Sequence, residues 1–129
     1  MSMDLFLWKA PVIDDEDEAR ELVDRYLEQD DKSAFEPSDD VARALDAIRR
    51  RYPDDPEGGA ERSAPWSSWP IPDSDRLIEL NIRWSVDGKV LDDIVAIAAE
   101  HDLVIYDPQG PDVYRAKDAP VSQLDEKAT

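Results

Sequence analysis

Carboxylates are the groups in this sequence that could do chemistry. The 129 residues include 32 Asp and Glu, one His and no Cys. Without cysteine the chain has no thiol nucleophile, no disulfide and no zinc–thiolate site. Paired carboxylates act as acid and base in glycosidases, but acidic pairs are so frequent here that none is distinguished from the others. The composition alone therefore identifies no catalytic group.

The densest acidic run, Asp14 to Glu18, could suggest a calcium loop. An EF-hand that began at Asp14 would need glycine at its sixth position and glutamate at its twelfth, where the sequence has Ala19 and Arg25. A transition-metal site would need clustered His or Cys, which the composition excludes. We therefore predict no metal site and no cofactor, and we interpret the run as the capped beginning of a helix.

The single histidine, His101, falls on the apolar side of a predicted helix, near its end. No hydroxyl group lies beside it in the sequence to serve as a nucleophile. The chain also lacks the glycine-rich loops that cradle phosphates and the G-x-S-x-G turn that exposes a catalytic serine. We therefore predict no catalytic residue and expect that the protein is not an enzyme.

Two tryptophans, Trp66 and Trp69, lie in the proline-rich stretch APWSSWPIP. Its prolines block continuous ladder pairing, so the stretch is expected at a sheet edge or in a loop. In one interpretation both rings cover apolar side chains of the sheet. In the other, at least one ring anchors a partner, because tryptophan is enriched at interface hot spots.

The formal net charge is −17. Such a field repels nucleic acid and anionic membranes and attracts cationic partners. We therefore expect a protein partner with a basic surface, and we expect neither nucleic acid nor a membrane as a partner. The alternative is that the acidity serves solubility alone. The candidate partner-binding residues are Trp66, Trp69, Asp14, Asp15, Asp17 and Glu18.

Hydrophobic periodicity predicts three helices. The first follows the acidic run and has its apolar stripe at helical spacing, from Ala19 to Leu27. The second begins after the N-cap Ser38 and ends in three arginines, Arg49 to Arg51, at the negative end of the helix dipole. The third follows the Asp87-Gly88 turn and ends at His101.

Strands are predicted over residues 4–8, in the Trp-Pro stretch, over residues 77–84 and over residues 103–107. The order of elements is then β-α(α)-β-β-α-β, the ferredoxin-like arrangement, an α+β fold with an antiparallel sheet and the helices on one face. We predict that residues 1–115 form a single domain that contains a mobile loop over 52–64. We expect residues 116–129 to form a flexible tail.

Strand alternation places Leu5 and Leu7 toward the helices and Phe6 and Trp8 on the other, open face of the sheet. The Trp-Pro stretch and the tail are the expected covers for these aromatic rings. If the face stays open, it could hold a small-ligand or enzymatic site. The residues that would line this site are Trp8, Arg83 and Tyr106.

The beginning of the chain has too short an apolar run and no cationic lead, so we expect neither a signal peptide nor a membrane span. The absence of cysteine fits a reducing compartment. A cytoplasmic location is therefore expected. The sequence indicates no oligomeric state.

Both ends of the chain carry short motifs. The first is D-L-x-x-W-K-x-P, with Asp4, Trp8, Lys9 and Pro11. The second, L-V-I-Y-D-P-Q, matches the pattern V-Y-D-P-Q at Tyr106, Asp107, Pro108 and Gln109. Together they resemble a group of small, poorly characterised, acidic bacterial proteins. Some members of that group resemble immunity proteins of bacterial toxin systems, and the resemblance implies no catalytic residues.

The leading hypothesis is a non-enzymatic, immunity-type inhibitor that occludes a cognate bacterial toxin. Such a toxin could be a basic nuclease, because nucleases must bind phosphate. The alternatives are the small-ligand or enzymatic module on the open sheet face and an acidic housekeeping protein without a dedicated partner.

Overall fold

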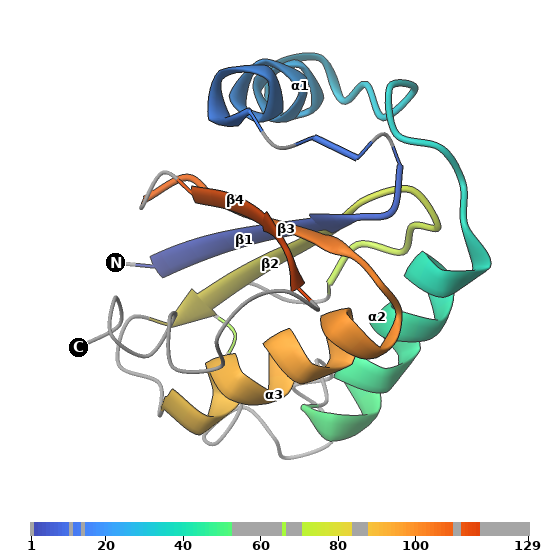
Figure 1. The fold of residues 1–129 in the computed structure, drawn as a ribbon, viewed down its shortest axis with the longest axis vertical. Helices are drawn as coiled ribbons and strands as arrows, with labels where there is room; N and C mark the ends of the chain where they lie inside the picture. The colour runs from blue at the N-terminus through green and yellow to red at the C-terminus, as the bar shows by residue number, and fades with distance from the viewer. Residues whose placement is uncertain are drawn as a thin grey trace.

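The computed structural model describes residues 2–10, 12–13, 15–52, 66, 71–83, 88–109 and 112–116. Its described part is an α+β fold with three helices and one four-stranded antiparallel sheet (Figure 1). In chain order the elements are β1 (Ser2–Trp8), α1 (Glu16–Gln29), α2 (Asp39–Arg51), β2 (Ile78–Arg83), α3 (Gly88–Glu100), β3 (Val104–Asp107) and β4 (Asp112–Arg115).

The first strand lies inside the sheet, whose strand order is β2-β1-β3-β4. β1 pairs antiparallel with β2 from Ser2↔Arg83 to Leu7↔Ile78, and with β3 from Phe6↔Tyr106 to Trp8↔Val104. β2 and β3 therefore run parallel to each other on either side of β1, and α3 connects them. The predicted antiparallel sheet and α+β class are confirmed.

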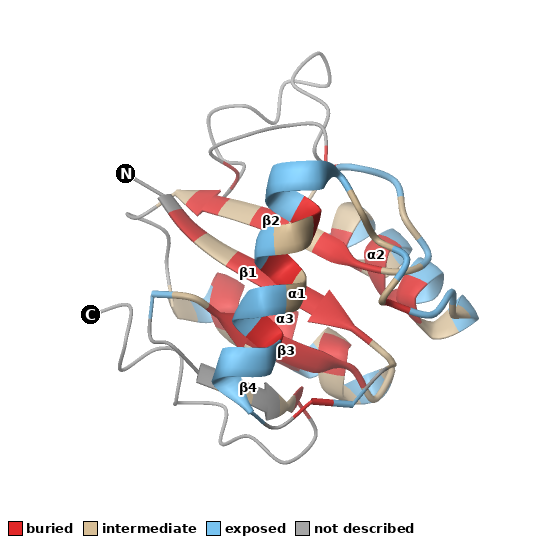
Figure 2. Cartoon of the chain, turned by 90° about the horizontal axis from the view of Figure 1, so that it is seen from above, coloured by how far each residue is buried: buried red, intermediate tan, exposed pale blue. Residues whose placement is uncertain are grey.

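The prediction that all helices lie on one face of the sheet is wrong. α2 and α3 cover one face, while α1 lies across the other (Figures 1 and 2). The alternation predicted for β1 is right, because Leu5 and Leu7 lie in the core beneath α2 and α3, and Phe6 and Trp8 lie beneath α1. Two large aromatic rings on the second face require an apolar cover, and the stripe of α1 supplies it.

The sheet thus separates two apolar cores. The larger one lies against α2 and α3, and it includes Leu5, Leu80, Ile94 and Ile105. The smaller one lies against α1. Its buried residues are Phe6, Trp8, Ile13, Ala19, Val23, Tyr26, Phe35, Leu77, Val104 and Tyr106.

The fourth strand was not predicted. The DPQG turn connects β3 to β4, which pairs antiparallel with β3 from Asp107↔Asp112 to Val104↔Arg115. Ala116, which we predicted as the first residue of the tail, is 1% exposed, and its N–H donates to the carbonyl of Leu103 at 2.9 Å. The ordered fold therefore extends to Ala116, and residues 117–129 lie outside the described residues.

The ferredoxin-like order would need a further strand in the Trp-Pro stretch. Of the residues there, Trp66 forms an isolated antiparallel bridge with Ile82, and the segment from Ile71 to Leu77 is not strand. Residues 67–70 lie outside the described residues, as does the predicted mobile loop from residue 53 onward. The ferredoxin-like topology therefore stays a prediction.

The helix ends differ in how well they match helix electrostatics. Asp15 caps α1 by accepting the N–H of Asp17 at 3.0 Å, and Ser38 caps α2 by accepting the N–H of Asp40 at 3.1 Å. α2 has three arginines in its last turn, as the dipole favours, whereas α1 has no basic residue there. α1 ends instead at Asp30, which has a φ of 53° in the left-handed region.

Candidate functional site

Trp66 is a structural side chain. It is 1% exposed in the larger core, and its Nε1–H donates to the carbonyl of Tyr52 at 3.0 Å. The ring of Tyr52 meets it edge-on, with 6.5 Å between the ring centroids. Trp66 therefore fills a core position beneath α2 and α3. The prediction that it covers Phe6 and Trp8 is wrong, because those two rings lie in the other core. Trp69 lies outside the described residues.

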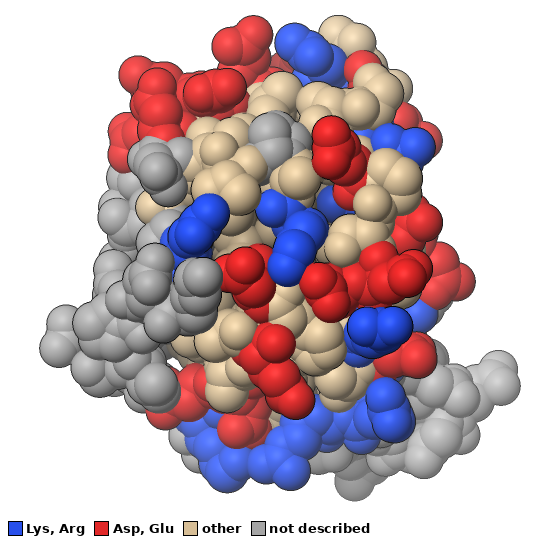
Figure 3. Space-filling model, turned by 45° about the vertical axis from the view of Figure 1, so that its right-hand side comes forward, with Lys and Arg blue, Asp and Glu red and all other residues tan. Residues whose placement is uncertain are grey.

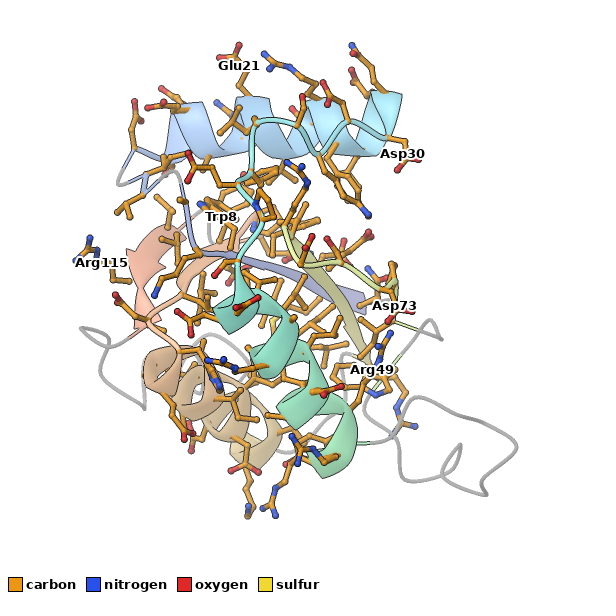
Figure 4. The ribbon with its side chains drawn as sticks, turned by 90° about the vertical axis from the view of Figure 1, so that its right-hand side faces the viewer. Trp8, Glu21, Asp30, Arg49, Asp73 and Arg115 are labelled. Carbon is orange, nitrogen blue, oxygen red and sulfur yellow. The ribbon has the colours of Figure 1, made fainter. Side chains whose placement is uncertain are left out.

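The sheet face that we expected to be open is covered by α1. Trp8 and Tyr106 are 0% and 1% exposed. The ring of Trp8 lies 5.2 Å from that of Phe35 and 6.4 Å from that of Tyr106, measured between centroids. Figure 4 shows Trp8 between α1 and the sheet. The aromatic rings that were to line a ligand site are thus core residues, and burial raises the pKa of the Tyr106 hydroxyl.

Arg83, the third residue of the expected open-face site, is half-buried at the end of β2. Its Nε is buried and has no hydrogen-bond partner among the described residues. By strand alternation it shares the α1 side of β2 with Asn81, whose side chain donates to Asp4 Oδ1 at 2.7 Å. With Trp8 and Tyr106 covered, Arg83 has no ligand site to complete on this face.

A tyrosine–carboxylate hydrogen bond fastens α1 to the polar side of β2. The hydroxyl of Tyr26 donates to Glu79 Oε1 at 2.5 Å. Burial, followed by this contact with the Glu79 carboxylate, raises the pKa of Tyr26 well above its ordinary value. Tyr26 therefore remains a neutral hydrogen-bond donor across the physiological range of pH.

The acidic candidates gather on α1. Asp15, Asp17 and Glu18 are exposed in its first turn, while Asp14 lies outside the described residues. Asp15 serves as the N-cap, and Asp17 pairs with Arg20 at 2.8 Å. These residues have the roles expected at the beginning of a helix, and they also form one end of a longer acidic surface.

That longer surface is the acidic face of α1, which we define as Asp17, Glu21, Asp24 and Glu28. All four are exposed, and they follow one another at the spacing i, i+4, i+7 and i+11. At 1.5 Å per residue the face is about 16 Å long. The candidate residues predicted from the sequence covered only the first turn, although the spacing of the whole row, opposite Ala19, Val23 and Tyr26, can be seen in the sequence.

The charge of α1 is strongly unbalanced. Its acidic residues are Glu16, Asp17, Glu18, Glu21, Asp24 and Glu28, six in all, against the two basic residues Arg20 and Arg25. Leu27 lies on the same helix and is 54% exposed, although we predicted it on the buried stripe. Figure 4 shows Glu21 and Asp30 pointing away from the sheet. α1 thus presents acidic groups together with an apolar side chain.

Basic residues gather at the other end of the molecule, where α2 ends (Figure 3). Most of them pair with carboxylates of the same surface. Arg51 and Lys89 lie 3.2 and 3.0 Å from Asp93, which also accepts the hydroxyl of Tyr52 at 2.5 Å. The Tyr52 hydroxyl, together with Lys89 and Arg51, lowers the pKa of Asp93. This cluster joins α2 to α3.

A polar hollow of about 420 Å³ lies between α2 and the segment before β2. Arg49 lies on its wall and pairs with Asp73 at 2.5 Å. Both side chains are labelled in Figure 4. Arg49 also donates to the carbonyl of Ile71. The hollow is bordered by exposed carboxylates, Asp46 and Asp75 among them. Its arginine already serves to hold the 71–73 segment against α2.

The residues of the two terminal motifs meet in the structure. Trp8 lies against Tyr106, as described above, and the N–H of Gln109 donates to Asp107 Oδ1 at 3.0 Å. With its amide nitrogen turned toward Asp107, the Gln109 side chain also donates to the carbonyl of Asp4 at 3.2 Å. The described residues of the two motifs therefore form one cluster, where β1 pairs with β3 and Gln109 contacts Asp4.

Lys9, also a motif residue, joins three elements. Its Nζ lies 3.0 Å from Asp40 at the beginning of α2 and 3.7 Å from Asp102, and it donates to the carbonyl of His101 at 3.2 Å. The hydrogen bond with Lys9 lowers the pKa of the Asp40 carboxyl. The His101 ring lies at the end of α3 with its Nδ1 2.8 Å from the carbonyl of Ile97, which fits an Nδ1–H donor.

Within the described ranges, no three His, Cys, Asp or Glu side chains come close enough together to hold a metal ion. None of the helices in this part of the chain is long and apolar enough to span a membrane. In comparisons with known proteins, no family model, no curated protein and no solved structure matches the chain.

Proposed function

We propose that this chain is a non-enzymatic binding protein that docks a basic protein partner on the acidic face of α1. The observation that carries the proposal is the exposed row of four carboxylates along one side of that helix. A row of like charges on one face creates a local field that steers an oppositely charged partner toward that face.

Leu27 gives this surface an apolar contact. With Val12, it is one of the large hydrophobic residues that remain exposed in the described part of the chain. An apolar contact within a charged rim is the usual composition of a protein interface. Leu27 takes the place that Trp66 had in the sequence-based hypothesis, because Trp66 is buried.

The partner class that best fits is a basic bacterial toxin, which the protein would neutralise by occluding its surface in the cytoplasm. Two features support this immunity-type proposal: the net charge of −17 and the resemblance of the terminal motifs to proteins that include immunity-like members. A toxin that acts on nucleic acid must present a cationic surface, and an acidic helix is complementary to it.

We also propose that the complete fold has the ferredoxin-like topology. The bridge between Trp66 and Ile82 would be one end of the additional edge strand. Support comes from β2 and β3, which lie on either side of β1 and pair with it antiparallel, with α3 as their connection.

The test uses the basic toxin domain encoded by the gene next to that of this protein. The association rate of the two full chains is measured by stopped flow at low and high salt. The triple variant Glu21→Lys, Asp24→Lys, Glu28→Lys should associate at least about tenfold more slowly than the wild type at low salt, and the difference should shrink at high salt.

The matched control is Asp46→Lys, Asp75→Lys, Glu100→Lys, which makes the same change in net charge at exposed positions outside α1. It should slow association by less than about threefold, because steering depends on where the charges lie. Equal slowing by the two triple variants would assign the effect to net charge alone. If the neighbouring genes encode no basic toxin, or if the pair fails to bind, the immunity-type proposal is wrong.

A further inference from the structure

The segment that contains α1 leaves the rest of the fold and returns to it at a single place. The N–H of Glu36 donates to the carbonyl of Ala10 at 3.0 Å, so the two ends of this segment lie side by side. Lys9, just before it, pairs with Asp40, just after it, at 3.0 Å. The connection from β1 to α2 is therefore held together independently of α1.

A second contact fixes the returning end. The guanidinium of Arg76 donates to the carbonyl of Phe35 at 2.9 Å, and the ring of Phe35 is buried against Trp8. Phe35 thus belongs to the body of the fold. The part that can move without breaking these contacts lies between Ala10 and Phe35.

Few side chains hold α1 on the sheet. α1 buries Ala19, Val23 and Tyr26, and Ile13 just before it is buried in the same core, whereas α2 buries four residues and α3 buries five. Its polar link to β2 is the hydrogen bond from Tyr26 to Glu79. Since apolar burial scales with the area removed from water, α1 gains less from docking than the other two helices.

The charges of α1 also oppose its closure. α1 carries six acidic and two basic residues, a net charge of −4, and the rest of the chain holds the other −13 of the net −17, so closure brings two negatively charged parts together. Lys32, whose Nζ lies 5.6 Å from the centroid of the Tyr26 ring, is a cation of the same segment.

We propose that the segment between Ala10 and Phe35 is a lid that opens as one unit over the second face of the sheet. The lid turns about the Ala10–Glu36 hydrogen bond and uncovers Phe6, Trp8 and Tyr106. The Tyr26–Glu79 hydrogen bond is its latch. Screening of the α1 carboxylates by salt favours the closed state. The proposal does not depend on the identity of any partner.

Amide hydrogen exchange of the full chain tests the lid. The amides of α1 should share one level of protection, at least about tenfold below that of the buried amides of α2, because local opening costs less than global unfolding. Tyr26→Phe removes the latch and should accelerate exchange in α1 by about a further tenfold, with exchange in α2 unchanged.

Tyr52→Phe is the matched control, because the hydroxyl of Tyr52 makes the equivalent hydrogen bond, to Asp93 at 2.5 Å, beneath the other face. It should leave the exchange of α1 unchanged. The lid is contradicted if α1 and α2 show equal protection in the wild type, or if Tyr26→Phe accelerates both helices equally.

A second measurement needs no variant and decides the question if Tyr26→Phe does not fold. Raising the NaCl concentration from about 0.01 M to about 0.5 M shortens the Debye length from about 30 Å to less than 10 Å. Exchange in α1 should then slow severalfold relative to α2. An equal response of the two helices to salt would overturn the proposal.

Discussion

The two faces of the sheet are covered in different ways. On one face, α2 and α3 bury nine residues between them, and their charged ends pair with each other through Asp93. On the other face, α1 buries three residues and presents a row of carboxylates outward. Asp40, Arg49 and Arg51 of α2 pair with residues of other parts of the fold, whereas the ion pairs Asp17–Arg20 and Glu21–Arg25 of α1 lie within that helix. The difference suggests that one face maintains the fold and the other is available for contact.

The residues of the terminal motifs help to maintain the fold. Asp4 contacts Gln109, and Trp8 packs against Tyr106. Lys9 pairs with Asp40 at the beginning of α2. These described motif residues therefore contribute to the packing of the fold. The immunity-type proposal draws on both the acidic net charge and the resemblance of these motifs.

The largest expected effect tests whether Trp66 belongs to the fold. Trp66→Ala removes a buried ring and leaves the carbonyl of Tyr52 without its donor, so it should lower the free energy of unfolding by about 3–5 kcal/mol. Chemical denaturation measures the loss. A loss below about 1 kcal/mol together with weakened partner binding would instead make Trp66 an anchor.

A matched pair of valines compares the two cores. Val41 of α2 and Val23 of α1 are 0% and 2% exposed. Val41→Ala should cost about 2 kcal/mol, whereas Val23→Ala should cost about 1 kcal/mol, because its loss cannot exceed the free energy of closing α1. Denaturation curves of both variants provide the values. A larger loss for Val23→Ala would show that α1 is as firmly integrated as α2.

The smallest effect concerns two surface ion pairs. Lys9→Met breaks the pair with Asp40 that joins β1 to α2 and should lower the free energy of unfolding by less than about 1 kcal/mol at pH 7. Arg20→Met breaks the exposed Arg20–Asp17 pair of α1 and should leave the free energy of unfolding unchanged within error. Urea unfolding of both variants at several pH values makes the comparison.

The effect of Lys9→Met should depend on pH. Because Lys9 lowers the pKa of the Asp40 carboxyl, the pair stabilises the fold fully above the ordinary Asp pKa of about 4 and loses this contribution as the pH falls through the lowered value. The difference from the wild type should therefore be present at pH 7 and shrink below about pH 4. A difference that is constant down to pH 2 would exclude Asp40 as the relevant partner.

Much of the local structure could be predicted from the sequence. Alternation in β1 and β2 identified the residues beneath each face, and Ser38 and the three arginines marked both ends of α2. These features follow from local geometry, since side-chain direction repeats every two residues in a strand and every 3.6 in a helix. For the same reason the buried stripe of α1 was predicted except for Leu27, which lies at its rim.

The placement of whole elements could not be predicted in this way. Periodicity shows which side of α1 is apolar, but it does not show which face of the sheet that side covers. β4 is as short as β3, but its sequence DVYR lacks the apolar run that identified β3. Of the candidate site, the first turn of α1 was predicted, but the acidic row from Asp17 to Glu28 was missed because the charges were explained as helix capping.

The central claim, that partners bind the α1 face and not the α2–α3 face, is tested most directly by a residue-resolved NMR titration. The isotope-labelled full chain is titrated with the basic toxin domain encoded by the neighbouring gene. We predict that the largest amide shift changes follow α1 from Asp17 to Glu28 and include Leu27, while buried amides of α2 and α3 change little. Shift changes centred on Arg49 to Arg51, or on the α3 surface, would contradict the account.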